Sequence, residues 1–170
     1  MKRLRGFFIF LVFILAIIAI ISLLLPSKVT IAKSVDINAS PEKITSQITD
    51  FEQWKNWYPA FSDENITVTN NTPGAHSVTL TDRNGKKMIL NITEAKPQMI
   101  NVQVQSSSSA KVNYRFILTP KINNQTQLTW DINTEMKWYP WKKIQGIFLD
   151  KISGNQYQTA LENLKKAAEN

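Results

Sequence analysis

The chain has 170 residues, of which 43% are hydrophobic and none is cysteine. The lack of cysteine excludes disulfides, thiolate metal sites and a thiol nucleophile. The net charge of +7 comes from basic residues scattered along the chain, so we expect no nucleic-acid partner.

An apolar run at residues 7–25 contains no charge, and Ser22 is its only polar side chain. At about 1.5 Å per residue it would cover roughly 28 Å, close to the apolar thickness of a bilayer. The basic residues Lys2, Arg3 and Arg5 precede it, which favours a cytoplasmic N-terminus. A cleaved signal peptide is the alternative, although its apolar region should be shorter.

We therefore predict a single-pass membrane protein with two parts. Residues 1–26 would be a cytoplasmic stub and a transmembrane anchor, with the membrane contacted through residues 7–25. Residues 27–170 would form one domain on the extracytoplasmic side, since about 145 residues suffice for one core and are few for two.

The start of the domain predicts one strand and two short helices. Apolar residues alternate along 29–37, which indicates a strand. Ser40 and Pro41 then provide an N-cap and a first helical residue. A second helix is expected from an N-cap at Asp50 to a stop at Pro59.

Six further runs alternate with a period of two, which indicates half-buried strands. Turn residues separate them, among them Asn84-Gly85 and Asn123-Asn124. Sequential hairpins imply an antiparallel sheet, and with the first strand the sheet has seven strands. The six runs lie around residues 66–68, 78–80, 88–92, 100–104, 112–118 and 128–132.

Residues 141–168 have a helical composition but carry two apolar stripes that one straight helix cannot bury together. Ser153-Gly154-Asn155 lies where the stripes lose register. We therefore expect a short helix, a break at residues 153–155, and a longer terminal helix packed on the sheet.

This order of elements resembles the START-like (SRPBCC) superfamily, in its polyketide cyclase/dehydrase branch. Residues 35–43 and 48–57 are similar to the start of that family, and residues 148–154 and 161–166 to its end. The resemblance implies an α+β helix-grip fold, in which a curved sheet surrounds a C-terminal helix. It says little about activity, because the fold hosts carriers, receptors and enzymes alike.

We find no catalytic residues, no metal ligands and no cofactor site in the sequence. Tyr114 is the one clear hydroxyl on the predicted inward faces, and we expect it to bond a backbone carbonyl. The only histidine, His76, follows a turn and should be solvated. The best-placed carboxylates are expected at caps or on the surface: Asp50, Asp131, Glu135 and Asp150.

The sequence therefore favours a membrane-anchored binding module that holds a lipid or other hydrophobic small molecule in an apolar cavity. A cyclase or dehydratase, or an interaction domain with a filled core and no ligand, are the alternatives. All five tryptophans, at positions 54, 57, 130, 138 and 141, are expected on the cavity wall or rim. The predicted ligand-binding residues are Trp57, Val102, Val104, Tyr114, Phe116, Trp130, Ile132, Trp141 and Phe148.

Overall fold

Seven strands form one antiparallel sheet, ordered β1-β7-β6-β5-β4-β3-β2, in the computed structural model of the chain. The structure describes residues 2–69, 74–106, 111–136 and 140–170. The predicted seven-stranded antiparallel sheet and its α+β class are confirmed. The strands are β1 (Lys28–Ile37), β2 (Ile66–Thr69), β3 (Ser77–Asp82), β4 (Lys87–Lys96), β5 (Met99–Ser106), β6 (Val112–Pro120) and β7 (Thr126–Glu135).

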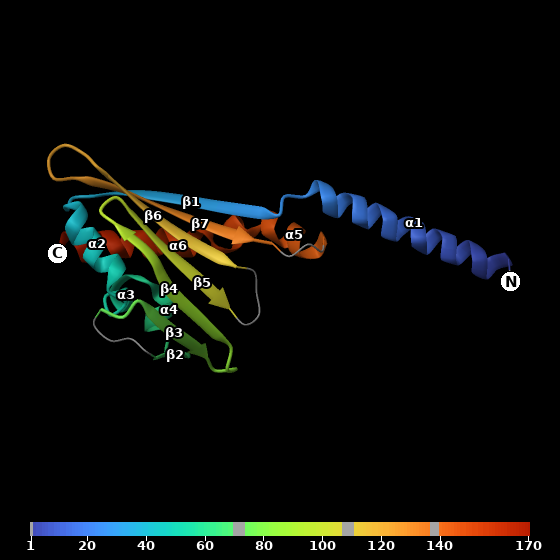
Figure 1. Cartoon of the computed structure of the whole chain (residues 1–170), viewed down its shortest axis with the longest axis horizontal. Coiled ribbons are helices and arrows are strands. Elements are labelled where there is room, and N and C mark those ends of the chain that lie inside the picture. The colour runs from blue at the N-terminus through green and yellow to red at the C-terminus, as the bar shows by residue number, and fades with distance from the viewer. Residues whose placement is uncertain (1, 70–73, 107–110, 137–139) are drawn as a thin grey trace.

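The helices lie against one face of this curved sheet, apart from the first, which extends away from it (Figure 1). The terminal helix packs on β1 and on the short third helix, which is the expected helix-grip arrangement. The helices are α1 (Lys2–Leu24), α2 (Pro41–Thr49), α3 (Trp54–Trp57), α4 (Pro59–Ser62), α5 (Pro140–Ile147) and α6 (Leu149–Glu169).

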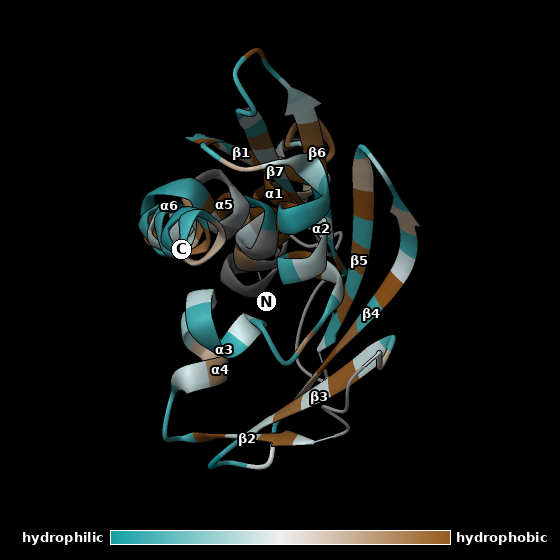
Figure 2. Cartoon of the chain, turned by 90° about the vertical axis from the view of Figure 1, so that its left-hand side faces the viewer, coloured by the Kyte–Doolittle hydropathy of each residue, from teal (hydrophilic) through white to brown (hydrophobic). Residues whose placement is uncertain are grey.

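Alternation of apolar and polar residues gives the sheet its buried face, as the bands along β4 and β5 show (Figure 2). In β7 every second residue from Thr126 to Thr134 is buried. The β6–β7 turn is set by Asn123 and Asn124, which both have positive φ, at 62° and 56°. Asparagine tolerates this left-handed conformation better than other non-glycine residues, which explains why the predicted turn forms here.

The second predicted helix is wrong in its limits. Asp50 caps the end of α2 instead of starting a helix, and its carboxylate accepts a hydrogen bond from the Glu52 backbone N–H at 3.0 Å. This local bond closes a turn, so α3 begins only at Trp54. Pro59 starts α4 instead of ending a helix, because proline fits the first helical position.

The break in the terminal segment is confirmed, but it lies at Phe148 and not at residues 153–155. Gly154 lies inside α6, where a Cβ atom would collide with the Asp150 carboxylate and come within 3.2 Å of Lys33 Nζ. Those two groups form an ion pair of 3.0 Å between α6 and β1. The glycine therefore makes room for this contact and does not end a helix.

The predicted membrane location is wrong. Among the residues that the structure describes, no helix is long and apolar enough to cross a membrane. A single-pass anchor at residues 7–25, a cytoplasmic N-terminus and an extracytoplasmic domain are therefore not supported. Residues 7–24 lie in α1, and the end of this helix is bound to α5. Lys143 Nζ donates to the carbonyls of Ser22 at 2.7 Å and of Leu25, just after the helix, at 3.1 Å.

We predict that Asn124→Ala lowers the free energy of unfolding by about 1 kcal/mol, because alanine is strained at positive φ. Asn124→Gly should have little effect, since glycine adopts this conformation freely. Urea unfolding of the two variants measures the difference. Equal stabilities would contradict the left-handed turn.

Candidate functional site

Aromatic side chains of β6 and β7 form the floor of the interior. Phe116 and Trp130 are paired across the two strands, and both are fully buried. Their rings stack with a centroid distance of 5.0 Å and an interplanar angle of 25°. They share a side of the sheet because alternate residues of a strand point the same way.

The short helix α3 covers this floor with two further indoles. Trp54 and Trp57 are buried, and their N–H groups donate to the carbonyls of Ile48 at 2.8 Å and Gln47 at 3.1 Å. The ring of Trp57 meets Trp130 edge-on at 6.0 Å. Aromatic rings therefore fill the interior beneath α3.

The structure brings seven of the nine predicted ligand-binding residues together. Trp141 and Phe148 lie apart from them, with 61% and 51% of their surface exposed. Trp138 is outside the described residues. That any of them binds a ligand stays a prediction. The seven buried residues are Trp57, Val102, Val104, Tyr114, Phe116, Trp130 and Ile132.

Three tyrosines meet at one edge of the aromatic core. The hydroxyls of Tyr58 and Tyr114 lie 3.0 Å apart, so the expected carbonyl partner of Tyr114 is wrong. The ring of Tyr157, in α6, meets Tyr114 at 6.2 Å, and their hydroxyls also interact. Burial is the main cause that raises the pKa of all three hydroxyls above the ordinary value of 10.0.

A pocket of about 450 Å³ opens beside these tyrosines. It lies between α4, β2 and the first half of α6, and its wall is mainly apolar. Tyr58 and Tyr157 line it and separate it from Trp130. The remaining lining residues are Pro59, Ala60, Asp63, Ile66, Asn155, Gln156 and Thr159.

A second hollow, of about 400 Å³, lies on the outer face of the sheet and is polar.

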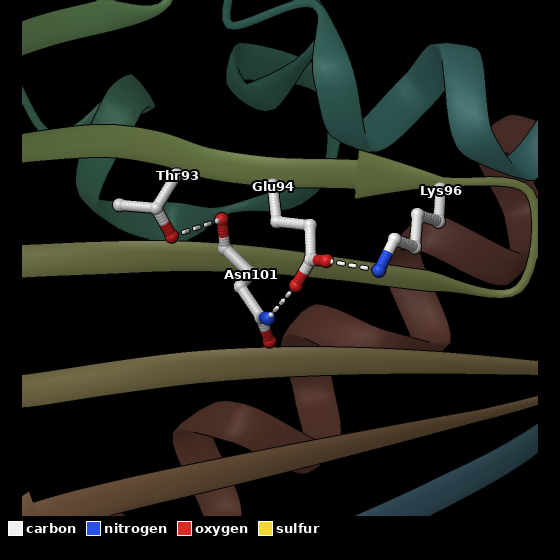
Figure 3. A network of polar contacts seen from close by, with 4 residues as sticks. All are labelled: Thr93, Glu94, Lys96 and Asn101. Carbon is white, nitrogen blue, oxygen red and sulfur yellow. Dashed lines mark hydrogen bonds and ion pairs between the residues drawn. The ribbon is translucent and has the colours of Figure 1, made fainter.

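The pairing of β4 with β5 shifts register between Ile92 and Glu94. Beside this bulge the Asn101 side chain donates to Glu94 at 2.7 Å, and Thr93 donates to the Asn101 carbonyl at 3.2 Å (Figure 3). Lys96 also pairs with Glu94 and lowers its pKa. These bonds fix the bulge, and we assign the network a structural role.

Metal chemistry finds no support in the part of the chain that the structure describes, where no three histidine, cysteine, aspartate or glutamate residues come together. His76 is exposed, as predicted. Asp150 pairs with Lys33, and Glu135 with Lys28 at 3.8 Å. These carboxylates are engaged on the surface and not in the interior.

The family model described as "Polyketide cyclase / dehydrase and lipid transport" matches residues 28–169. The chain belongs to this family. A search of the curated proteins finds no relative that matches.

Solved structures share the fold of this family member. A START superfamily protein from Mycobacterium smegmatis is 23% identical, with a TM-score of 0.61 over 83% of this chain and 97% of its own. The Zhui aromatase/cyclase from a Streptomyces species is 12% identical, with a TM-score of 0.60 over 84% and 94%. A conserved protein from Geobacillus kaustophilus is 15% identical, with a TM-score of 0.60 over 83% and 94%. At these identities the likeness establishes the START-like fold alone.

Sequence reasoning missed the helical half of the pocket in this polyketide cyclase/dehydrase family member. Tyr157 is absent from the predicted ligand-binding residues, and Asn155 was expected at a helix break. The available signal was the hydroxyl of Tyr157. This residue follows the helical spacing of the apolar residues of α6, which are Leu161, Leu164 and Ala168. Such a residue needs a partner when it packs against a sheet.

We predict that Phe116→Ala lowers the free energy of unfolding by about 3 to 5 kcal/mol, because removal of its ring leaves a cavity among the packed rings around it. Chemical denaturation measures the loss. Ile117→Ala is the matched control: this neighbour is only half-buried on the opposite face and should cost much less. A small loss for Phe116→Ala would mean that the interior is open and not filled.

The raised tyrosine pKa values predict a loss of stability at alkaline pH. In the unfolded chain a tyrosine ionises near pH 10, about its ordinary pKa. Above that pH the unfolded state releases protons that the folded state keeps, so stability falls as pH rises. Tyr58→Phe should flatten this fall above about pH 10 and leave the pH dependence below about pH 9 unchanged. Unfolding measured across this range would refute the prediction if both slopes were equal.

Proposed function

We propose that the chain binds a hydrophobic small molecule, such as a lipid fragment, in the pocket between α4, β2 and α6. The observation that carries the proposal is the mainly apolar pocket of about 450 Å³, which has two tyrosines among its lining residues. Small-molecule sites typically combine an apolar lining with a few polar groups. The family description, which includes lipid transport, supports the same class of ligand.

The driving force for such a ligand is sufficient. Burial of roughly 300 Å² of apolar ligand surface at about 25 cal/mol per Å² yields around 7 to 8 kcal/mol. The loss of translational and rotational freedom on association offsets several kcal/mol of this gain. Micromolar or weaker affinity follows.

Binding is favoured over catalysis by the chemistry of the pocket. A general acid or base works best when its pKa is close to the working pH. The pKa values of Tyr58 and Tyr157 are instead raised by burial. The carboxylate of Asp63 already accepts two bonds of 2.8 Å from Asn65. A cyclase or dehydratase activity is therefore the less favoured alternative.

The test is thermal unfolding of the full chain with decanoate, a lysophospholipid and n-butylbenzene. At least one of them should raise the unfolding temperature in a saturable way, because a ligand that binds only the folded state stabilises it. Native mass spectrometry of the purified chain would show a co-purifying molecule directly.

Ala60→Trp should abolish the shift, since the indole fills the pocket from α4. Thr67→Trp is the matched control, because Thr67 is exposed on β2 beside the lining residue Ile66 and alternate strand residues point to opposite faces. If no ligand raises the unfolding temperature, the result supports the alternative of an interaction domain with a filled core and no ligand. Equal loss in both variants would place the ligand elsewhere.

A further inference from the structure

Trp130 contains a buried hydrogen-bond donor without an acceptor. Its side chain is fully buried, and its Nε1–H has no partner among the described residues. The neighbouring indoles of Trp54 and Trp57 differ, since each donates to a backbone carbonyl. An unsatisfied buried donor is destabilising, so the group at Trp130 requires an explanation.

The pocket is lined by two tyrosine rings that contact the Trp130 ring. The rings of Tyr58 and Tyr157 line the pocket, and their centroids are 5.9 Å and 5.1 Å from that of Trp130. Both tyrosines are half-buried, and the hydroxyls of both interact with Tyr114. The Tyr157 ring is the nearer of the two to Trp130, so its rotation is the movement that would let a ligand in the pocket reach the indole.

We infer that the ligand carries an uncharged hydrogen-bond acceptor, a carbonyl or ether oxygen, which accepts from Trp130 Nε1 when the Tyr157 ring turns aside. This inference rests on the proposed function and names the class of its ligand. The ligand is thus an apolar skeleton with one buried oxygen.

The charges around the pocket exclude an anionic group in this position. The described lining residues include Asp63 and no lysine, arginine or histidine. A carboxylate buried among aromatic rings would lose its hydration without a cation in exchange, which is costly. The tyrosine hydroxyls stay protonated at neutral pH because burial raises their pKa values, so they accompany a neutral oxygen as donors or acceptors.

The test compares butyrophenone with n-butylbenzene, which share a skeleton and differ in one carbonyl, and adds the phenylbutyrate anion. Each is titrated into the ¹⁵N-labelled full chain while the indole N–H resonances are followed. Butyrophenone should move the Trp130 resonance downfield and bind about three- to tenfold more tightly than n-butylbenzene, the range that one net hydrogen bond supports. Phenylbutyrate should bind more weakly than the ketone. The resonances of Trp54 and Trp57 are internal controls and should move less.

Trp130→Phe should reduce the affinity for butyrophenone to that for n-butylbenzene and leave the affinity for the hydrocarbon unchanged. If this variant fails to fold, the Trp130 resonance of the unaltered chain decides the matter. Equal binding of ketone and hydrocarbon, with a stationary Trp130 resonance, overturns the inference and leaves the proposed function intact. Tighter binding of phenylbutyrate also overturns the inference. Binding of none of the three overturns both.

Discussion

The stacking of Phe116 on Trp130 is the contact on which the rest of the interior depends. It joins the neighbouring strands β6 and β7 and provides the surface on which Trp57 and the tyrosines pack. Each aromatic side chain buries on the order of 200 Å², or roughly 5 kcal/mol of transfer free energy. Because the two short helices α3 and α4 have only four residues each, this burial and not helix propensity stabilises them.

A filled interior moves the proposed ligand site to the edge of the core. The apolar cavity was expected among residues such as Trp57, Phe116 and Trp130, but the rings of these residues pack against one another. The second half of α6 is fixed by Ala160, Leu161, Leu164 and Ala168, all fully buried. Its first half packs on the core through the partly buried Leu149 and Tyr157, and the Lys33–Asp150 ion pair adds little, because its carboxylate is 61% exposed. The pocket opens along this half.

Residue patterns predicted the sheet well because each strand has one buried face, and a period of two is visible in a single strand. The turn at Asn123-Asn124 was also predictable, because it depends only on the local backbone conformation, which favours asparagine at positive φ. The limits of α3 and the break near α6 were predicted less well. The sequence does not distinguish the possible roles of Asp50 and Gly154. The role of Asp50 depends on its bond from the Glu52 N–H, and that of Gly154 on Lys33, which comes near only in the folded sheet.

The candidate site was only half predictable for the same reason. Phe116 and Trp130 follow from strand alternation, whereas Tyr58 lies between α3 and α4 and Tyr157 in α6, and no local pattern encodes the approach of these segments. The membrane assignment rested on composition alone, and the described helices do not support it.

The choice of tryptophan at position 130 illustrates how fold and site constrain one residue. A phenylalanine there would keep a stacked ring against Phe116 and would avoid the cost of a buried unpaired N–H. The larger indole contributes more apolar area, since it also reaches Tyr114 and Tyr157 at 5.1 Å each. Packing therefore accounts for the size of the side chain, but not for the nitrogen. The inferred ligand oxygen accounts for the nitrogen, because it would supply the acceptor that Trp130 Nε1 lacks among the described residues.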